Sequence, residues 1–219
     1  MSDKIDEAYR HCERLVRAHD KDHYLASLFA PADRRRYLFA LYAFALELAR
    51  IKRLVKEPMV GAIRLQWWHE AIEGLRAEEA AANPVMSALQ DAARQTNASL
   101  APLIAAVEAR EGELHGAPPV GAAAAVFIVA ARLLGGEGEA IVSAADHAAQ
   151  AVTSVEAEPG KAREAYDAFR RMIEKLPEAA PPAFLPVALV PLRLKRPDAP
   201  QWRRQIVLLR TAWFGFPKI

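Results

Sequence analysis

The chain has 219 residues, of which 53% are hydrophobic and 26% charged, and its formal net charge is +2. This length suffices for one domain with a sizeable core, and the composition excludes a disordered or fibrous chain. A charge so close to zero is not typical of nucleic-acid-binding proteins, so we predict no nucleic-acid partner. The longest mainly apolar run, residues 120–131, is too short to span a membrane.

The first residues are polar and lack the apolar segment of a signal peptide, and the single cysteine, Cys12, has no partner within the chain. We therefore expect a cytoplasmic protein, peripheral on the inner membrane if it meets a membrane at all.

In chain order, apolar residues at helical spacing first predict a helix over residues 5–18. A central helix follows over residues 34–55, with one apolar stripe formed by Tyr37, Leu41, Phe44, Leu48, Ile51 and Val55. The next helix, over residues 58–76, has Ile63, Trp67, Ala71 and Leu75 on one side. We predict that these two helices pack as an antiparallel pair in the core.

Proline, glycine and asparagine separate the later helices. Asn83 is a predicted cap and Pro84 a predicted first-turn residue of a helix that runs to about residue 97. Further helices are expected in the stretches 100–118, 120–136, 138–155 and 161–176, and Gly135-Gly136 would end the buried one. With no credible strand, we predict an all-α single domain of about nine to eleven helices.

Histidines do not form an obvious metal site. His11, His19 and His23 are spread over several turns, and His69 with Glu73 gives only two ligands on one helix. We predict neither a metal site nor a catalytic residue.

ALYAF at Ala40 to Phe44, preceded by arginines and followed by EPMVGAIRLQWWHEAIEG, resembles the squalene/phytoene synthase family of all-α prenyltransferases. NPVMSAL and LPEAAPPAFLPVALV extend the resemblance over about residues 8–194. It implies a somewhat shortened helical bundle of the isoprenoid (terpenoid) synthase type over residues 1–195. Residues 196–219 would form a basic, aromatic helix or tail docked on the bundle or adjoining it.

In catalytic members of that family, the central helix continues into a DxxxD segment that holds magnesium and a prenyl diphosphate. The corresponding positions here are Ala49 and Arg53, with Arg50 between them, and neither alanine nor arginine is a ligand for this hard cation. The second acidic segment of the family falls on residues 138–155, where Asp146 is the only aspartate.

Three alternatives follow from the resemblance. The first is a non-catalytic pseudoenzyme that acts by protein or membrane contact, since the motifs are closest to an aspartate-lacking branch that includes assembly factors of respiratory complex I. The second is a prenyltransferase in isoprenoid biosynthesis, and only this one needs a cofactor, Mg²⁺, held by other acids. The third binds an isoprenoid or lipid without chemistry. A vestigial cavity or phosphate site would be bordered by Phe39, Tyr42, Leu46, Arg50, Arg53, Glu108, Glu113 and Asp146.

The C-terminal residues interleave basic and aromatic side chains, which suits an anionic membrane or an acidic partner. The residues predicted for such contact are Arg193, Lys195, Arg196, Trp202, Arg203 and Arg204. The alternative is a last helix that docks Trp202, Ile206 and Leu209 on the core and leaves its arginines in water.

Overall fold

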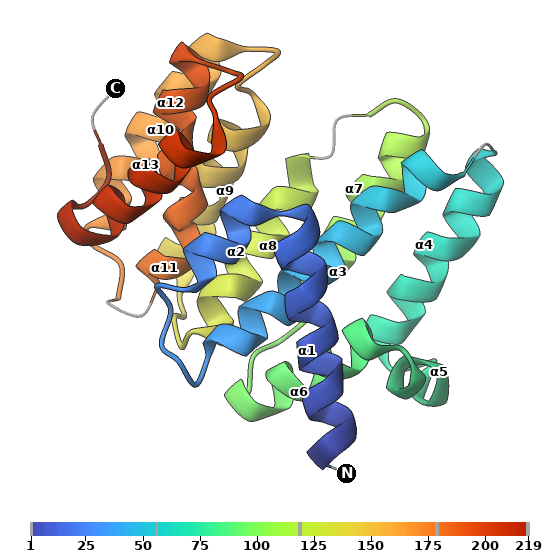
Figure 1. Ribbon diagram of the computed structural model, residues 1–219. Coiled ribbons are helices and arrows are strands. Elements are labelled where there is room, and N and C mark those ends of the chain that lie inside the picture. The colour runs from blue at the N-terminus through green and yellow to red at the C-terminus, as the bar shows by residue number, and fades with distance from the viewer. Residues whose placement is uncertain (1, 56, 118–119, 178–179, 218–219) are drawn as a thin grey trace.

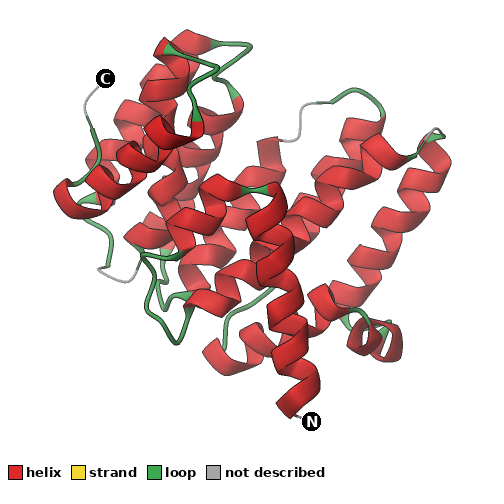
Figure 2. Ribbon diagram, viewed as in Figure 1, coloured by secondary structure: helices red, strands yellow, loops and turns green. Residues whose placement is uncertain are grey.

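The computed structural model describes residues 2–55, 57–117, 120–177 and 180–217. These residues form thirteen α-helices and one short 3-10 helix and contain no strand (Figures 1 and 2), which confirms the predicted all-α fold. Three of the helices, α5, α11 and α12, have only four to six residues. The elements are α1 (Ser2–His19), α2 (Lys21–Ser27), α3 (Arg35–Leu54), α4 (Pro58–Glu73), α5 (Ala77–Ala82), α6 (Pro84–Thr96), α7 (Pro102–Leu114), α8 (Val120–Leu133), α9 (Glu139–Thr153), α10 (Pro159–Ile173), α11 (Pro181–Phe184), η1 (Leu185–Leu189), α12 (Val190–Lys195) and α13 (Gln201–Phe214).

Helix α3 is the centre of the bundle, and α1, α6, α7 and α8 pack around it (Figure 1). The predicted stripe of α3 is buried from Tyr37 to Ile51, and only its last member, Val55, is half-buried. Residues 37–44 of the helix are buried on all sides, because Leu38, Ala40 and Ala43 between the stripe residues are fully covered as well. A helix that is apolar all round belongs inside a protein, so α3 organises the core.

Helix α4 packs chiefly on α7 rather than on α3, and this changes which of its faces is buried. Its buried residues are Gly61, Leu65, Trp68 and Ala71, whereas Ile63 and Leu75 are 65% and 71% exposed. The predicted inner side of this helix was therefore wrong at Ile63, and Leu75 lies beyond the end of α4 at Glu73. Gly61 explains the orientation, since a Cβ at this position would lie 2.8 Å from Leu114 Cδ1 of α7, closer than packed atoms approach.

The predicted helix boundaries around α6 and α8 are confirmed. Asn83 accepts hydrogen bonds from the backbone N–H groups of Val85 and Met86, both at 3.0 Å, and so caps α6. Asn97 ends the same helix in the left-handed conformation with φ 55°. Gly135, with φ 95°, follows α8.

Helix α13 docks on α2 and η1 through Leu208, which packs in a small cluster with Ala26, Leu185 and Leu189. Trp202, Ile206 and Leu209 face outward and are 55%, 47% and 52% exposed, so the predicted docking face of this helix was wrong. The division of the chain at residue 195 stays a prediction. No helix in the described ranges has both the length and the apolar character that crossing a membrane requires.

Candidate functional site

A cavity of about 310 Å³ lies between α2, α3, α7, α8 and α9, with η1 and α12 at its edge. This volume is at the small end of the range for ligand-binding pockets. Most of its wall is apolar and includes Phe44, Leu48, Ala106, Ala122, Val126, Phe127, Val152 and Pro186. The polar part of the wall includes four charged side chains, Asp20, Asp22, Arg110 and Arg193, together with His23 and Tyr42.

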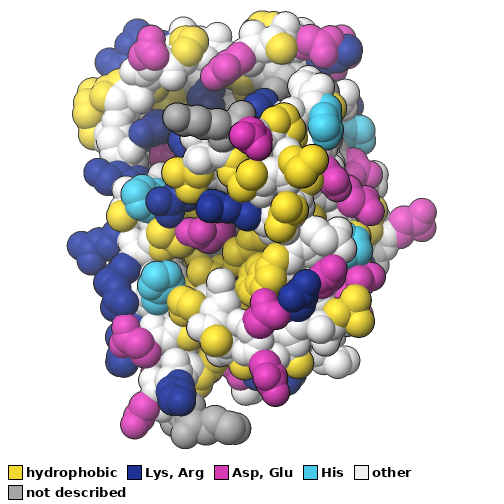
Figure 3. Space-filling view, turned by 90° about the vertical axis from the view of Figure 1, so that its right-hand side faces the viewer, with side chains coloured by type: hydrophobic (Ala, Val, Ile, Leu, Met, Phe, Trp, Pro, Cys, Tyr) yellow, Lys and Arg dark blue, Asp and Glu magenta, His cyan; other side chains and the backbone are white. Residues whose placement is uncertain are grey.

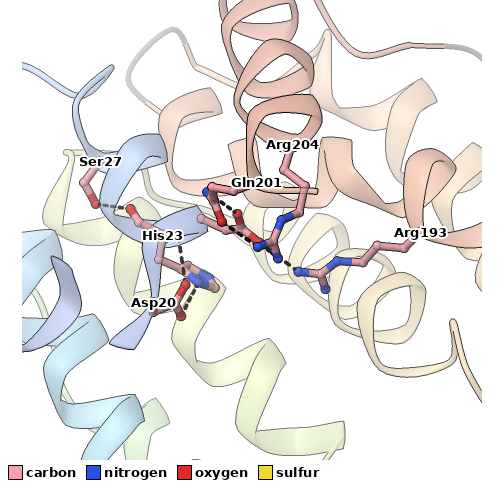
Figure 4. Close-up of polar contacts among 7 residues, drawn as sticks. Asp20, His23, Ser27, Arg193, Gln201 and Arg204 are labelled. Carbon is pink, nitrogen blue, oxygen red and sulfur yellow. Dashed lines mark hydrogen bonds and ion pairs between the residues drawn. The ribbon is translucent and has the colours of Figure 1, made fainter. Parts of the chain in front are cut away.

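Asp20 and His23 form one polar pair of the cavity wall (Figure 4). Asp20 is the N-cap of α2, where its carboxylate accepts a hydrogen bond from the His23 backbone N–H at 3.1 Å. Its other oxygen lies 2.7 Å from His23 Nδ1. Burial opposes the charged form of each partner, but the opposite charge and the hydrogen bonds more than offset it. The pKa of Asp20 is therefore lowered to about 2, and the pKa of His23 is raised.

Asp22 joins the N-terminal and C-terminal parts of the chain beside the cavity. Its carboxylate is buried and accepts hydrogen bonds from Arg193 of α12 at 3.2 Å and from Arg204 of α13 at 3.0 Å (Figure 4). Gln201 adds a longer contact of 3.5 Å. Charge-assisted bonds of this kind are the strong ones, so Asp22 fixes α12 and α13 against α2.

Tyr42 of α3 brings a buried polar atom to the cavity wall. The residue is 2% exposed, and its ring centroid lies 4.4 Å from that of His23. Burial raises the pKa of the phenol. Among the described residues its hydroxyl has no hydrogen-bond partner, which is unusual for a buried polar group. A ligand or water in the cavity would satisfy it.

The structure brings only some of the predicted site residues to this cavity. Tyr42, Leu46 and Ala49 line it, whereas Phe39 stacks on Tyr24 with 5.4 Å between ring centroids. Arg50 pairs with Glu47 at 3.2 Å, and Arg53 is exposed on the same helix.

The three acids of the predicted site, Glu108, Glu113 and Asp146, are not collected at the cavity. Glu113 pairs with Arg110 at 2.8 Å and lies 3.9 Å from Lys52 Nζ, while Glu108 and Asp146 are exposed. No three His, Cys, Asp or Glu side chains among the described residues are grouped to hold a metal ion. With Ala49 and Arg53 at the two aspartate positions and Arg50 between them, the residues present do not fit a magnesium–diphosphate site.

Sequence reasoning missed Asp20, Asp22 and Arg110. The Asp-x-x-His spacing of Asp20 and His23 at a helix start is a signal for a capped pair. Asp22 carries no such local signal, because its partners Arg193 and Arg204 are 171 and 182 residues away in the chain.

The six C-terminal residues predicted for membrane or partner contact divide into two groups. Arg193 and Arg204 are ion-paired to Asp22 inside the protein. Lys195, Arg196 and Trp202 are exposed, and the guanidinium of Arg203 lies 5.0 Å from the centre of the Trp202 ring. Whether the exposed group contacts a membrane stays a prediction.

Comparison with known proteins adds evidence from outside the chain. A family model described as squalene/phytoene synthase matches residues 16–125, half of the chain. A Bos taurus protein named NADH dehydrogenase (ubiquinone) complex I, assembly factor 6 is 36% identical over 105 residues, or 48% of this chain and 32% of that protein. The Homo sapiens protein of the same name is 36% identical over 104 residues, 48% of this chain and 31% of its own length. A Drosophila melanogaster homolog is 37% identical over 73 residues, 33% of this chain and 22% of that protein. The matches thus span about a third or less of these relatives' lengths.

Proposed function

The chain belongs to the squalene/phytoene synthase family, and we propose that within it the chain is a non-catalytic protein that assists assembly of respiratory complex I through a protein contact. The names of its relatives, which are complex I assembly factors, support this role. In this proposal the chain is a pseudoenzyme, works without a cofactor, and acts at the inner face of a membrane.

The observation that carries the proposal is Ala49 in the cavity wall. The resemblance to catalytic members assigns a magnesium ligand to this position, and a methyl group offers no oxygen. Ionisation of a prenyl diphosphate depends on metal-held phosphate charge, so the loss of this ligand removes the main source of catalysis.

An exposed apolar surface at the start of α4 supports the protein contact. Leu54, Met59, Val60 and Ile63 are 62%, 74%, 42% and 65% exposed. Figure 3 looks onto the side of the molecule on which α4 lies, and hydrophobic side chains gather across the middle of that face between charged ones. Gathered apolar side chains on a surface mark interaction sites. These four residues, the α4 surface, lie within the part of the chain that the family model matches.

The chemistry is tested by incubating the purified chain with farnesyl and geranylgeranyl diphosphates, with and without Mg²⁺, and following diphosphate release. We expect no release under either condition. Magnesium-dependent release would overturn the non-catalytic proposal.

The assembly role is tested in cells that lack this gene, with assembled complex I measured on native gels. We expect reduced assembly that the wild-type chain restores and a Met59→Ser/Ile63→Ser variant does not. Leu75→Ser is the matched control, because Leu75 is 71% exposed outside the α4 surface. Normal assembly of complex I without the gene would refute the assembly role. Full rescue by the double variant would show that the α4 surface is not needed for it.

The cavity favours a second candidate function, the binding of an isoprenoid or other lipid without chemistry. The apolar wall and the unpartnered Tyr42 hydroxyl support it. We expect a prenyl diphosphate to raise the melting temperature without Mg²⁺, and Ala49→Phe to abolish this shift by filling the cavity. An unchanged shift in Ala49→Phe would place the ligand elsewhere.

A further inference from the structure

Large apolar side chains form an exposed stripe along α13. Trp202, Ile206, Leu209 and Trp213 are spaced by four, three and four residues, which places them on one side of a helix. They are 55%, 47%, 52% and 74% exposed, and Phe214 beside them is 80% exposed. These five residues, the outer face of α13, span about 18 Å along the helix axis. Apolar side chains gathered in this way on a surface require a partner.

This face cannot turn inward, because the opposite face of α13 is already docked. Leu208 and Thr211 are 1% and 5% exposed, and Arg204 holds Asp22 at 3.0 Å. Beyond the helix, the Tyr166 hydroxyl donates a hydrogen bond to the Pro217 carbonyl at 2.8 Å, and Phe216 packs on Phe169 with 5.2 Å between ring centroids. The helix is fixed on its inner side and at its end, so it presents the apolar stripe outward.

Basic residues border the stripe on one side, since Arg203 and Arg210, seven positions apart, share one face of α13 beside it. The sequence of residues 180–217 contains six basic residues and a single acid, Asp198, and α13 itself has no acid. Arg193 and Arg204 are neutralised by Asp22, but Lys195, Arg196, Arg203 and Arg210 take part in none of the ion pairs formed within the described residues. Lys195, Arg196 and Arg210 are exposed, and the Arg203 guanidinium lies over the Trp202 ring.

From this arrangement we propose that the outer face of α13 docks on an anionic lipid surface, lying in the plane of the headgroups. A single convex helix fits a fluid, flat surface without a preformed groove. Tryptophans near both ends of the stripe and arginines along one flank match the side-chain distribution of interfacial helices. An acidic protein with a complementary groove is the competing occupant. The inference deepens the membrane part of the proposed function, on which it rests, by naming the surface that meets the lipid, and a failure of vesicle binding would leave the complex I assembly role standing.

The first test uses the purified full chain and two kinds of vesicle, phosphatidylcholine alone and phosphatidylcholine mixed with phosphatidylglycerol. We expect co-sedimentation with the anionic vesicles and its loss at high salt. Each basic residue near such a surface contributes roughly fivefold in binding, so Arg203→Gln/Arg210→Gln should weaken binding about 25-fold. The matched control is Arg10→Gln/Arg14→Gln, which removes two arginines whose side chains are 60% and 62% exposed on α1.

The second test asks whether this particular face enters the membrane. Lipids brominated along the acyl chain should quench tryptophan fluorescence of the wild-type chain. Trp202→Phe/Trp213→Phe should keep vesicle binding and lose most of the quenching, since the remaining Trp67 and Trp68 lie on α4. Trp202→Ser/Trp213→Ser should weaken binding while its far-ultraviolet circular dichroism stays unchanged.

Three results would overturn the proposal. One is no binding to anionic vesicles. Another is that Arg10→Gln/Arg14→Gln weakens vesicle binding as much as Arg203→Gln/Arg210→Gln does, which would mean that only the net charge of the protein matters. The third is binding in which the Trp202→Phe/Trp213→Phe variant retains the quenching, which would mean that another surface meets the lipid. The first result combined with a complex between α13 and an acidic protein would favour the competing occupant.

Discussion

Replacing Asp22 should loosen the C-terminal helices from the bundle. Its carboxylate is the shared acceptor of Arg193 and Arg204, and its own side chain is only 8% exposed. Removing one partner of a fully buried ion pair costs about 3–5 kcal/mol. Here the arginine side chains are 38% and 31% exposed, so water can solvate them after the change. We therefore expect Asp22→Ala to lower the free energy of unfolding by about 2 kcal/mol.

Urea denaturation followed by circular dichroism measures this change in free energy. In a separate thermal scan, a destabilisation of this size should lower the melting temperature of a domain of this length by about 4–8 °C. Hydrogen exchange should lose protection in α12 and α13 before the rest of the bundle, because these are the helices that Asp22 holds. Asp33→Asn, at an exposed aspartate, is the control and should change stability by less than about 0.5 kcal/mol. If Asp22→Ala matches that control in both stability and exchange, the ion pairs do not fix α12 and α13.

Three further changes test separate features of the structure. The pKa of His23 is raised above its ordinary value of 6.5, and that of Asp20 is lowered from 3.8 to about 2. Their pairing should therefore contribute its full stabilisation between pH 3.8 and pH 6.5, where both groups are charged in the folded and in the unfolded chain. The difference in urea midpoint between wild type and His23→Gln should shrink as the pH rises through the raised His23 pKa; a difference that does not vary with pH would contradict the pairing. Asn83→Ala should cost about 1 kcal/mol in urea unfolding, because two N–H groups of α6 lose their acceptor, and an unchanged midpoint would deny the cap. Tyr42→Phe should leave the stability of the ligand-free chain unchanged or raise it by up to about 1 kcal/mol, since it removes an unpartnered buried hydroxyl; a clear loss in urea unfolding would mean that the hydroxyl has a partner.

Local signals in the sequence predicted the fold well. Asn83-Pro84 and Gly135-Gly136 mark helix boundaries by backbone chemistry that acts within a few residues, and the structure confirms both. The stripe of α3 was also predictable, because residues 37–44 are apolar on every side of the helix.

The faces of α4 and α13 were not predictable from the same periodicity. Each helix has two candidate apolar sides, and long-range contacts decide between them. In α4 the choice depends on the close approach of Leu114 to Gly61, and in α13 on the attraction between Arg204 and Asp22. Neither partner is adjacent in sequence, so helical spacing alone selected Ile63 on one helix and Trp202 on the other, both of which are exposed.

The candidate site likewise contains residues that the sequence predicts and residues that only the fold reveals. Its α3 residues Tyr42, Leu46 and Ala49 follow from one helix and a family resemblance, and all three line the cavity. Asp20, Asp22, Arg110 and Arg193 come from three other helices and one helix cap, and only the folded chain brings them together.

The bond between Asp22 and Arg204 also sets an order for co-translational folding. The two residues are 182 positions apart, and ribosomes add about 5–20 residues per second, so α2 exists for roughly 10–40 seconds before α13 has been synthesised. During that interval the Asp22 carboxylate is solvated and the cavity lacks the side that α12 later supplies. A nascent chain stalled before residue 193 would therefore present an open apolar chamber to chaperones until α12 has been made.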